Sequence, residues 1–130
     1  MNTEILNRCL EGALSAKMTF GETIGHMIEA EVEWYSANLI FGMTTHYFAD
    51  LSHHQAKWTN YTQPEIAQTF SEVGVVAAIR AIQKREITYR EFLQRIADAG
   101  VVYYTVHLQG RKAIYFGRHG DFYIEPFPKF

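Results

Sequence analysis

Residues 87–110 read ITYREFLQRIADAGVVYYTVHLQG, and this stretch decides the fold. It opens with capping-box spacing: the Thr88 hydroxyl can bond the amide three residues on, and Glu91 can bond back to the Thr88 amide. Apolar side chains then recur at helical spacing as far as Ala99, and Gly100 stands where a helix-ending glycine belongs. From residue 101 onward apolar and polar side chains alternate, which is typical of a half-buried strand. The stretch therefore predicts a helix followed directly by a strand.

The same pattern occurs earlier in the chain, where residues 18–41 read MTFGETIGHMIEAEVEWYSANLIF. The two stretches align at an offset of 69 positions, with Thr19 meeting Thr88. Beyond residue 41 the alignment needs a one-residue slip, after which Tyr47-Phe48 meets Tyr115-Phe116. Internal repeats constrain architecture strongly. The other identical pairs are Glu22/Glu91, Ala30/Ala99, Val32/Val101, Tyr35/Tyr104 and Leu39/Leu108.

The repeat predicts an α+β fold in one domain, residues 1–130. Each half, about 4–50 and 64–128, reads helix, helix, strand, strand, and a polar linker at 50–63 joins them. Two such units can pair into one antiparallel sheet with helices packed on one face, which makes the protein an internal duplication. The expected helices are 4–16, 20–30, one or two that fill 63–84, and 88–99; the expected strands are 32–41, 43–49, 101–109, 112–118 and 121–125.

Composition excludes several function classes. The net charge of −2 and the pI of about 6.3 argue against a dedicated nucleic-acid binder, which usually carries a basic stripe. No apolar run is long enough to span a bilayer, and no signal peptide is visible. Cys9 is the single cysteine, so an internal disulfide is impossible. We therefore expect a cytoplasmic protein with no membrane partner and no nucleic-acid partner.

The second half also carries a family resemblance. Several segments resemble the YbcV-like family: residues 81–83, 86–93, 95–100 and 110–111, the Tyr-Phe-Gly-Arg-His-Gly run at 115–120, and the closing Glu-Pro-Phe-Pro at 125–128. That family comprises small, uncharacterised bacterial proteins, some of prophage origin and some labelled "phage envelope protein". The chain departs from the family at Val101, where cysteine is common. The resemblance implies no catalytic residue and no cofactor, and it suggests a prophage-associated accessory protein.

The candidate binding surface is the outward face of the two central strands. Positions i, i+2 and i+4 of a strand share a face. In each repeat an aromatic side chain is followed there by a hydroxyl and then by a hydrogen-bonding group. This face could hold a small ligand or mediate self-association, or the linker or the helical segment 63–84 could cover it. The residues are Trp34, Ser36 and Asn38 from one repeat, and Tyr103, Thr105 and His107 from the other.

Histidines suggest an alternative chemistry. His46, Asp50, His53 and His54 lie within nine residues, and imidazole and carboxylate are competent metal ligands, although the spacing matches no established motif. Glu33 stands among predicted core positions, where an unpaired carboxylate would have a raised pKa and could act as an acid or base. The favoured alternative is that the strand begins later and Glu33 is exposed at its end.

Two main hypotheses follow from the residues. The first is a non-enzymatic binding or interaction protein, self-associating as a homo-oligomer or holding a small molecule on the aromatic-polar face. The second is a small enzyme, with or without a metal ion, that uses His46, His53 and His54, or His107. The chain has no glycine-rich phosphate loop, nucleophile elbow or Cys-x-x-Cys motif, so neither a cofactor nor a reaction is specified.

Overall fold

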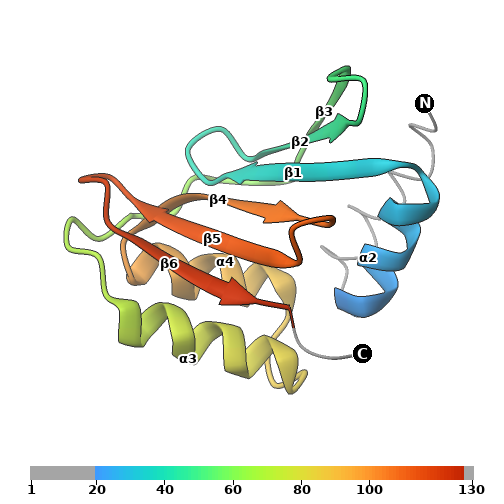
Figure 1. The fold of residues 1–130 in the computed structure, drawn as a ribbon. Coiled ribbons are helices and arrows are strands. Elements are labelled where there is room, and N and C mark those ends of the chain that lie inside the picture. Colours follow the sequence, from blue (N-terminus) through green and yellow to red (C-terminus); the bar gives the residue numbers. More distant parts are fainter. Residues whose placement is uncertain (1–19, 128–130) are drawn as a thin grey trace.

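The structure, a computed structural model, describes residues 20–127. This part of the chain forms three helices and one six-stranded antiparallel sheet of order β3-β2-β1-β4-β5-β6 (Figure 1), so the predicted α+β class is confirmed. The predicted helix at 4–16, the Thr19 cap and Cys9 lie outside the described residues. The elements are α2 (Phe20–Glu29), β1 (Val32–Asn38), β2 (Met43–Phe48), β3 (His53–Lys57), α3 (Glu72–Gln83), α4 (Tyr89–Asp98), β4 (Val101–His107), β5 (Lys112–Gly117) and β6 (Phe122–Pro126).

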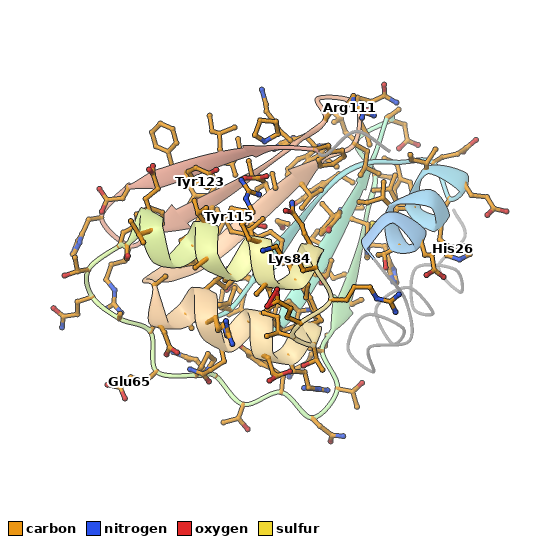
Figure 2. All side chains as sticks on the ribbon, turned by 90° about the horizontal axis from the view of Figure 1, so that it is seen from below. His26, Glu65, Lys84, Arg111, Tyr115 and Tyr123 are labelled. Atoms are coloured by element: carbon orange, nitrogen blue, oxygen red, sulfur yellow. The ribbon has the colours of Figure 1, made fainter. Side chains whose placement is uncertain are left out.

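Helices α3 and α4 lie side by side against one face of the sheet (Figures 1 and 2). The capping box predicted for α4 is present, with both hydrogen bonds between Thr88 and Glu91 formed. Helix α2 packs Ile24 and Met27 into the same core. Strand residues alternate between this core and the other face, so the sheet has one helix-covered face and one face without a described helix.

The two halves repeat at a constant offset. Adding 69 to the bounds of α2, β1, β2 and β3 gives those of α4, β4, β5 and β6. Left-handed backbone recurs at the same offset, with φ of 66° at Glu31 and 89° at Gly100. The predicted one-residue slip is therefore wrong, because Tyr47 corresponds to Phe116 and its neighbour His46 corresponds to Tyr115 on the core face.

A β-bulge near the start of each central strand changes which residues face the core. The register shifts between Val32 and Trp34, and again between Val101 and Tyr103. Strict alternation placed the two valines on the outward face, but both are buried. A bulge adds one residue to its strand, so the residues on either side of it change faces relative to simple alternation.

Two expectations for the middle of the chain are wrong. Strand β3 lies inside the segment 50–63 that was expected to be a linker, and it pairs with β2. The helix expected from residue 63 begins at Glu72, where Ser71 is the N-cap. Residues 61–71 instead run without regular structure past the end of α4, where Ala67 and Ser71 donate backbone hydrogen bonds to Ala97 and Ala99.

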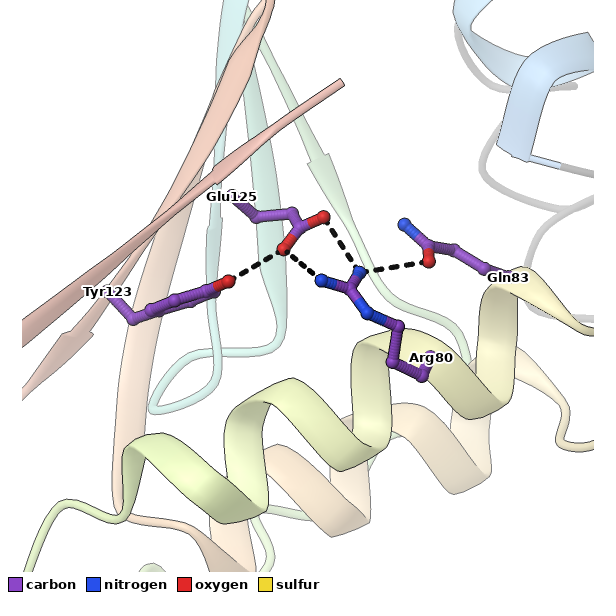
Figure 3. A network of polar contacts seen from close by, with 4 residues as sticks. All are labelled: Arg80, Gln83, Tyr123 and Glu125. Carbon is purple, nitrogen blue, oxygen red and sulfur yellow. Dashed lines mark hydrogen bonds and ion pairs between the residues drawn. The ribbon is translucent and has the colours of Figure 1, made fainter. Parts of the chain in front are cut away.

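A polar network fastens the edge strand β6 to α3 (Figure 3). Arg80 makes two hydrogen bonds to Glu125, of 2.8 and 3.2 Å, and a third of 3.0 Å to Gln83. The Tyr123 hydroxyl donates to the same carboxylate at 2.8 Å. Burial alone would raise the pKa of Glu125, but the hydrogen bonds from Arg80 and Tyr123 outweigh it and lower the pKa. Glu125 is therefore a paired structural anion.

We expect Glu31→Gly to stabilise the protein by about 1 kcal/mol, because a side chain in left-handed backbone is strained and glycine is not. The equivalent position of the second half is already a glycine, Gly100. The free energy of unfolding in urea checks this expectation. The neighbouring change Glu29→Gly, inside α2, should act in the opposite direction by a similar amount. Equal effects at the two positions would contradict the strain at Glu31.

Candidate functional site

The candidate site is the sheet face opposite α3 and α4, called here the open face. Strand register arranges its residues in three rows that cross all six strands, and none of them is buried. Row one is His53, Tyr47, Trp34, His107, Lys112 and Pro126. Row two is Gln55, Thr45, Ser36, Thr105, Ile114 and Ile124. Row three is Lys57, Met43, Asn38, Tyr103, Phe116 and Phe122.

The two trios proposed from the sequence meet at the centre of the open face. Strands β1 and β4 are adjacent, and the register pairs Trp34 with His107, Ser36 with Thr105, and Asn38 with Tyr103. The seam between the halves is therefore lined by all six residues. In the described part of the chain, neither the linker nor the helical segment covers the open face, because α3 and the segment 58–71 both lie toward the helix-covered face.

Aromatic rings on row one form a stack across three strands. The rings of Trp34 and Tyr47 are 3.9 Å apart and inclined by 10°, and Trp34 and His107 are 5.6 Å apart and inclined by 14°. Both faces of the indole are thus covered. Row three holds a second stacked pair, Tyr103 and Phe116, at 4.8 Å. A ligand can reach the edge of Trp34, whereas the exposed Tyr103 offers more of its surface.

Several polar side chains of the seam already form hydrogen bonds within the protein. The Nε2 of His107 lies 2.9 Å from the hydroxyl of Thr105. Burial, with a smaller effect from the Lys112 charge, lowers the pKa of His107, so its ring is neutral at pH 7. The side-chain oxygen of Asn38 accepts from the amides of Ile40 and Phe41 and so holds the β1–β2 turn. Ser36 and Thr45 stand side by side in row two.

Strand geometry separates the four residues considered as metal ligands. His46 and His54 pair across β2 and β3 on the helix-covered side, with ring centroids 6.1 Å apart. His53 is on the open face, and Asp50 lies in the intervening turn, where it accepts from Ser52. Residues 20–127 contain no group of three or more His, Cys, Asp or Glu side chains that could hold a metal ion.

His46 is a fully buried polar side chain, and neither of its ring nitrogens has a hydrogen-bond partner among residues 20–127. Burial, reinforced by the nearby His54, lowers its pKa to about 4. Glu33, the other candidate for acid–base chemistry, lies in the β1 bulge and is half-buried. It therefore is not among the core side chains of β1.

Sequence analysis did not identify a tyrosine cluster on the core side of the second half, in which Tyr104 and Tyr115 are buried and Tyr89 is partly buried. The hydroxyls of Tyr89 and Tyr104 hydrogen-bond to each other, and the rings of Tyr104 and Tyr115 stack 5.0 Å apart. Burial raises the pKa of Tyr89 to about 12 and raises the pKa of the other two phenols as well. The cluster is therefore neutral at physiological pH. The sequence did carry a signal for this cluster, because strand alternation puts Tyr104 and Tyr115 on the core side of neighbouring strands.

Comparisons with known proteins find relatives that are themselves described as uncharacterised. An uncharacterised protein of Mycobacterium bovis, Mb2035, and one of Mycobacterium tuberculosis, Rv2012, are each 39% identical to this chain over 56 residues. The match covers 43% of this chain and 34% of each relative, so the chain matches about a third of their length.

Two further findings bear on the site. No helix within residues 20–127 has the length and apolar character needed to cross a membrane. The family model described as "Protein of unknown function (DUF1398)" matches residues 12–126, a span that includes every strand of the open face. The chain belongs to the DUF1398 family.

Proposed function

We propose that this protein is a non-catalytic binding module and that the open face is its binding surface. The observation that carries the proposal is the seam, where the two trios pair directly across β1 and β4 on a face that no described helix covers. An exposed sheet face rich in aromatic side chains is typical of interaction surfaces. The constant offset of 69 residues supports an origin by internal duplication.

Other parts of the sequence reading remain predictions. These are the narrower YbcV-like assignment, the prophage association, the cytoplasmic location and self-association. An enzymatic role has less support, because within residues 20–127 the four strand histidines are divided between the two faces of the sheet: His46 and His54 on the helix-covered face, His53 and His107 on the open face. The single His–hydroxyl pair on the open face, His107 with Thr105, lacks a third group that orients the imidazole as an activated nucleophile requires.

The test removes the two most prominent aromatic side chains of the seam. We expect Trp34→Ala combined with Tyr103→Ala to abolish oligomers or bound molecules that native mass spectrometry detects in gently purified wild-type protein. Val73→Ala is the matched control, because Val73 is an exposed apolar residue on α3. Fluorescence of the buried Trp58, whose indole donates to Thr44, reports that the double variant is folded.

Three results would contradict the binding proposal. One is a species that persists unchanged in the folded double variant. The second is its loss in Val73→Ala as well. The third is a wild-type protein that is a bare monomer and binds nothing in a broad ligand screen.

A further inference from the structure

The open face differs in charge from the rest of the molecule. The chain has 14 acidic and 12 basic residues, yet none of the residues in the three rows is Asp or Glu. Two lysines, Lys57 and Lys112, stand on this face, and neither forms an ion pair within the described part of the chain. Glu33 lies outside the rows, in the bulge. The face is therefore cationic although the whole chain is slightly acidic.

The positions of the two lysines indicate the size of an anionic partner. Lys57 is in row three on β3, and Lys112 is in row one on β5, four strands away. Strand spacing puts their α-carbons on the order of 20 Å apart. A single phosphate or carboxylate cannot contact both, whereas a chain of anionic groups that crosses the sheet diagonally can. The same charges oppose a dimer in which two open faces meet, because each copy would bring its lysines toward the other.

The aromatic side chains indicate what the anionic groups are attached to. Tyr103 is 38% exposed and Phe122 is 58% exposed, and both stand in row three on either side of Phe116. Aromatic side chains on an open antiparallel sheet stack against unpaired bases, while lysines contact the phosphates. Thr45, Ser36 and Thr105 in row two supply hydroxyl groups that can hydrogen-bond base edges.

We propose that the partner of the open face is a single-stranded nucleic acid, which crosses the sheet with its phosphates toward Lys57 and Lys112 and its bases against Tyr103 and Phe122. This inference rests on the proposed function, since it names the partner of the same surface. The pI of about 6.3 pointed away from such a partner because it averages over the whole chain, whereas the strand register places two lysines and no carboxylate in the three rows of the open face.

The experiment measures the fluorescence anisotropy of labelled twelve-residue oligonucleotides, oligo(dT) and oligo(U), across a series of salt concentrations. We expect wild type to bind, and Lys57→Gln with Lys112→Gln to weaken binding about tenfold near 0.1 M salt. The slope of log affinity against log salt should fall by about 1.4, since each phosphate contact to a single strand contributes about 0.7. Tyr103→Ala with Phe122→Ala should weaken binding at least about fivefold, without changing the slope.

Lys84→Gln is the matched control, because Lys84 is an exposed cation on the helix side of the molecule (Figure 2). It should leave both affinity and slope unchanged. Three results would overturn the inference: no binding of either oligonucleotide, an equal loss in Lys84→Gln, or displacement by oligo-glutamate of equal charge as effective as by unlabelled oligonucleotide, which would identify an acidic peptide. If the oligonucleotide measurements fail while the Trp34→Ala and Tyr103→Ala test of the open face succeeds, the open face is a binding surface and only the identity of its partner is wrong.

Discussion

Gly100→Ala should destabilise the protein by at least about 2 kcal/mol. Gly100 has φ of +89° between α4 and β4, where a β-carbon costs about 1–2 kcal/mol from backbone conformation alone. The added carbon would also lie 2.6 Å from the carbonyl oxygen of Thr69 and 2.9 Å from the α-carbon of Phe70. Both are backbone atoms, so relief requires moving the segment that passes the end of α4. Urea unfolding followed by the signal of buried Trp58 measures the loss.

Gly120→Ala is the matched control for this substitution. Gly120 has nearly the same backbone conformation, with φ of +88°, but nothing lies within 4 Å of the position a β-carbon would take. Its replacement should therefore cost only the conformational part, about 1 kcal/mol. The difference between the two variants isolates the contact with residues 69–70. Equal losses at the two glycines would show that this contact does not constrain the chain.

His46 should make the protein sensitive to mild acid. Burial holds the pKa of its ring at about 4, below the ordinary 6.5, so between these values the unfolded chain takes up a proton that the folded chain excludes. The contribution of neutral His46 to the free energy of unfolding is therefore fully present above about pH 6.5, and it is lost as the pH falls toward 4. The total loss is on the order of 3 kcal/mol, since each unit of pKa corresponds to about 1.4 kcal/mol.

His46→Phe should remove most of this dependence between pH 6.5 and 4. An aromatic ring suits the position, because Tyr115 occupies the equivalent place in the second half. Phenylalanine also eliminates two buried nitrogens that have no hydrogen-bond partner in the part of the chain that the structure describes. The measurement is the urea midpoint at a series of pH values, with His53→Phe on the exposed β3 edge as control. If wild type and His46→Phe lose stability in parallel, the titrating group lies elsewhere.

Much of this architecture was accessible from the sequence because local signals agree. Thr88, Glu91 and Gly100 mark the two ends of α4 through capping chemistry that needs no tertiary contact. Alternation then assigns Trp34 and Tyr103 to one face, and the repeat places their strands in equivalent roles. The pairing of those strands at the centre of the sheet follows from joining two similar units, and it brings the candidate site together.

The errors arise where distant parts of the chain decide the local structure. The bulges beside Val32 and Val101 depend on pairing with β2 and β5, which no single strand reveals. Strand β3 is polar because it is an edge strand whose one fully buried residue is Ala56, so it lacks the hydrophobic pattern of an inner strand. The segment after Pro64 finds its hydrogen-bond acceptors at the end of α4, which keeps it out of a helix.

The seam between β1 and β4 also has a consequence for how the chain folds. The other strand pairs of the sheet join neighbours connected by short turns, so each half can build its three-stranded meander from local contacts. At the seam, Ser36 meets Thr105 from the opposite half of the sequence. Closing so long a loop costs entropy before its contacts form, and such contacts slow folding. The rate-limiting step is therefore expected to be the docking of two preformed meanders, in which the hydrogen bonds between β1 and β4 form last.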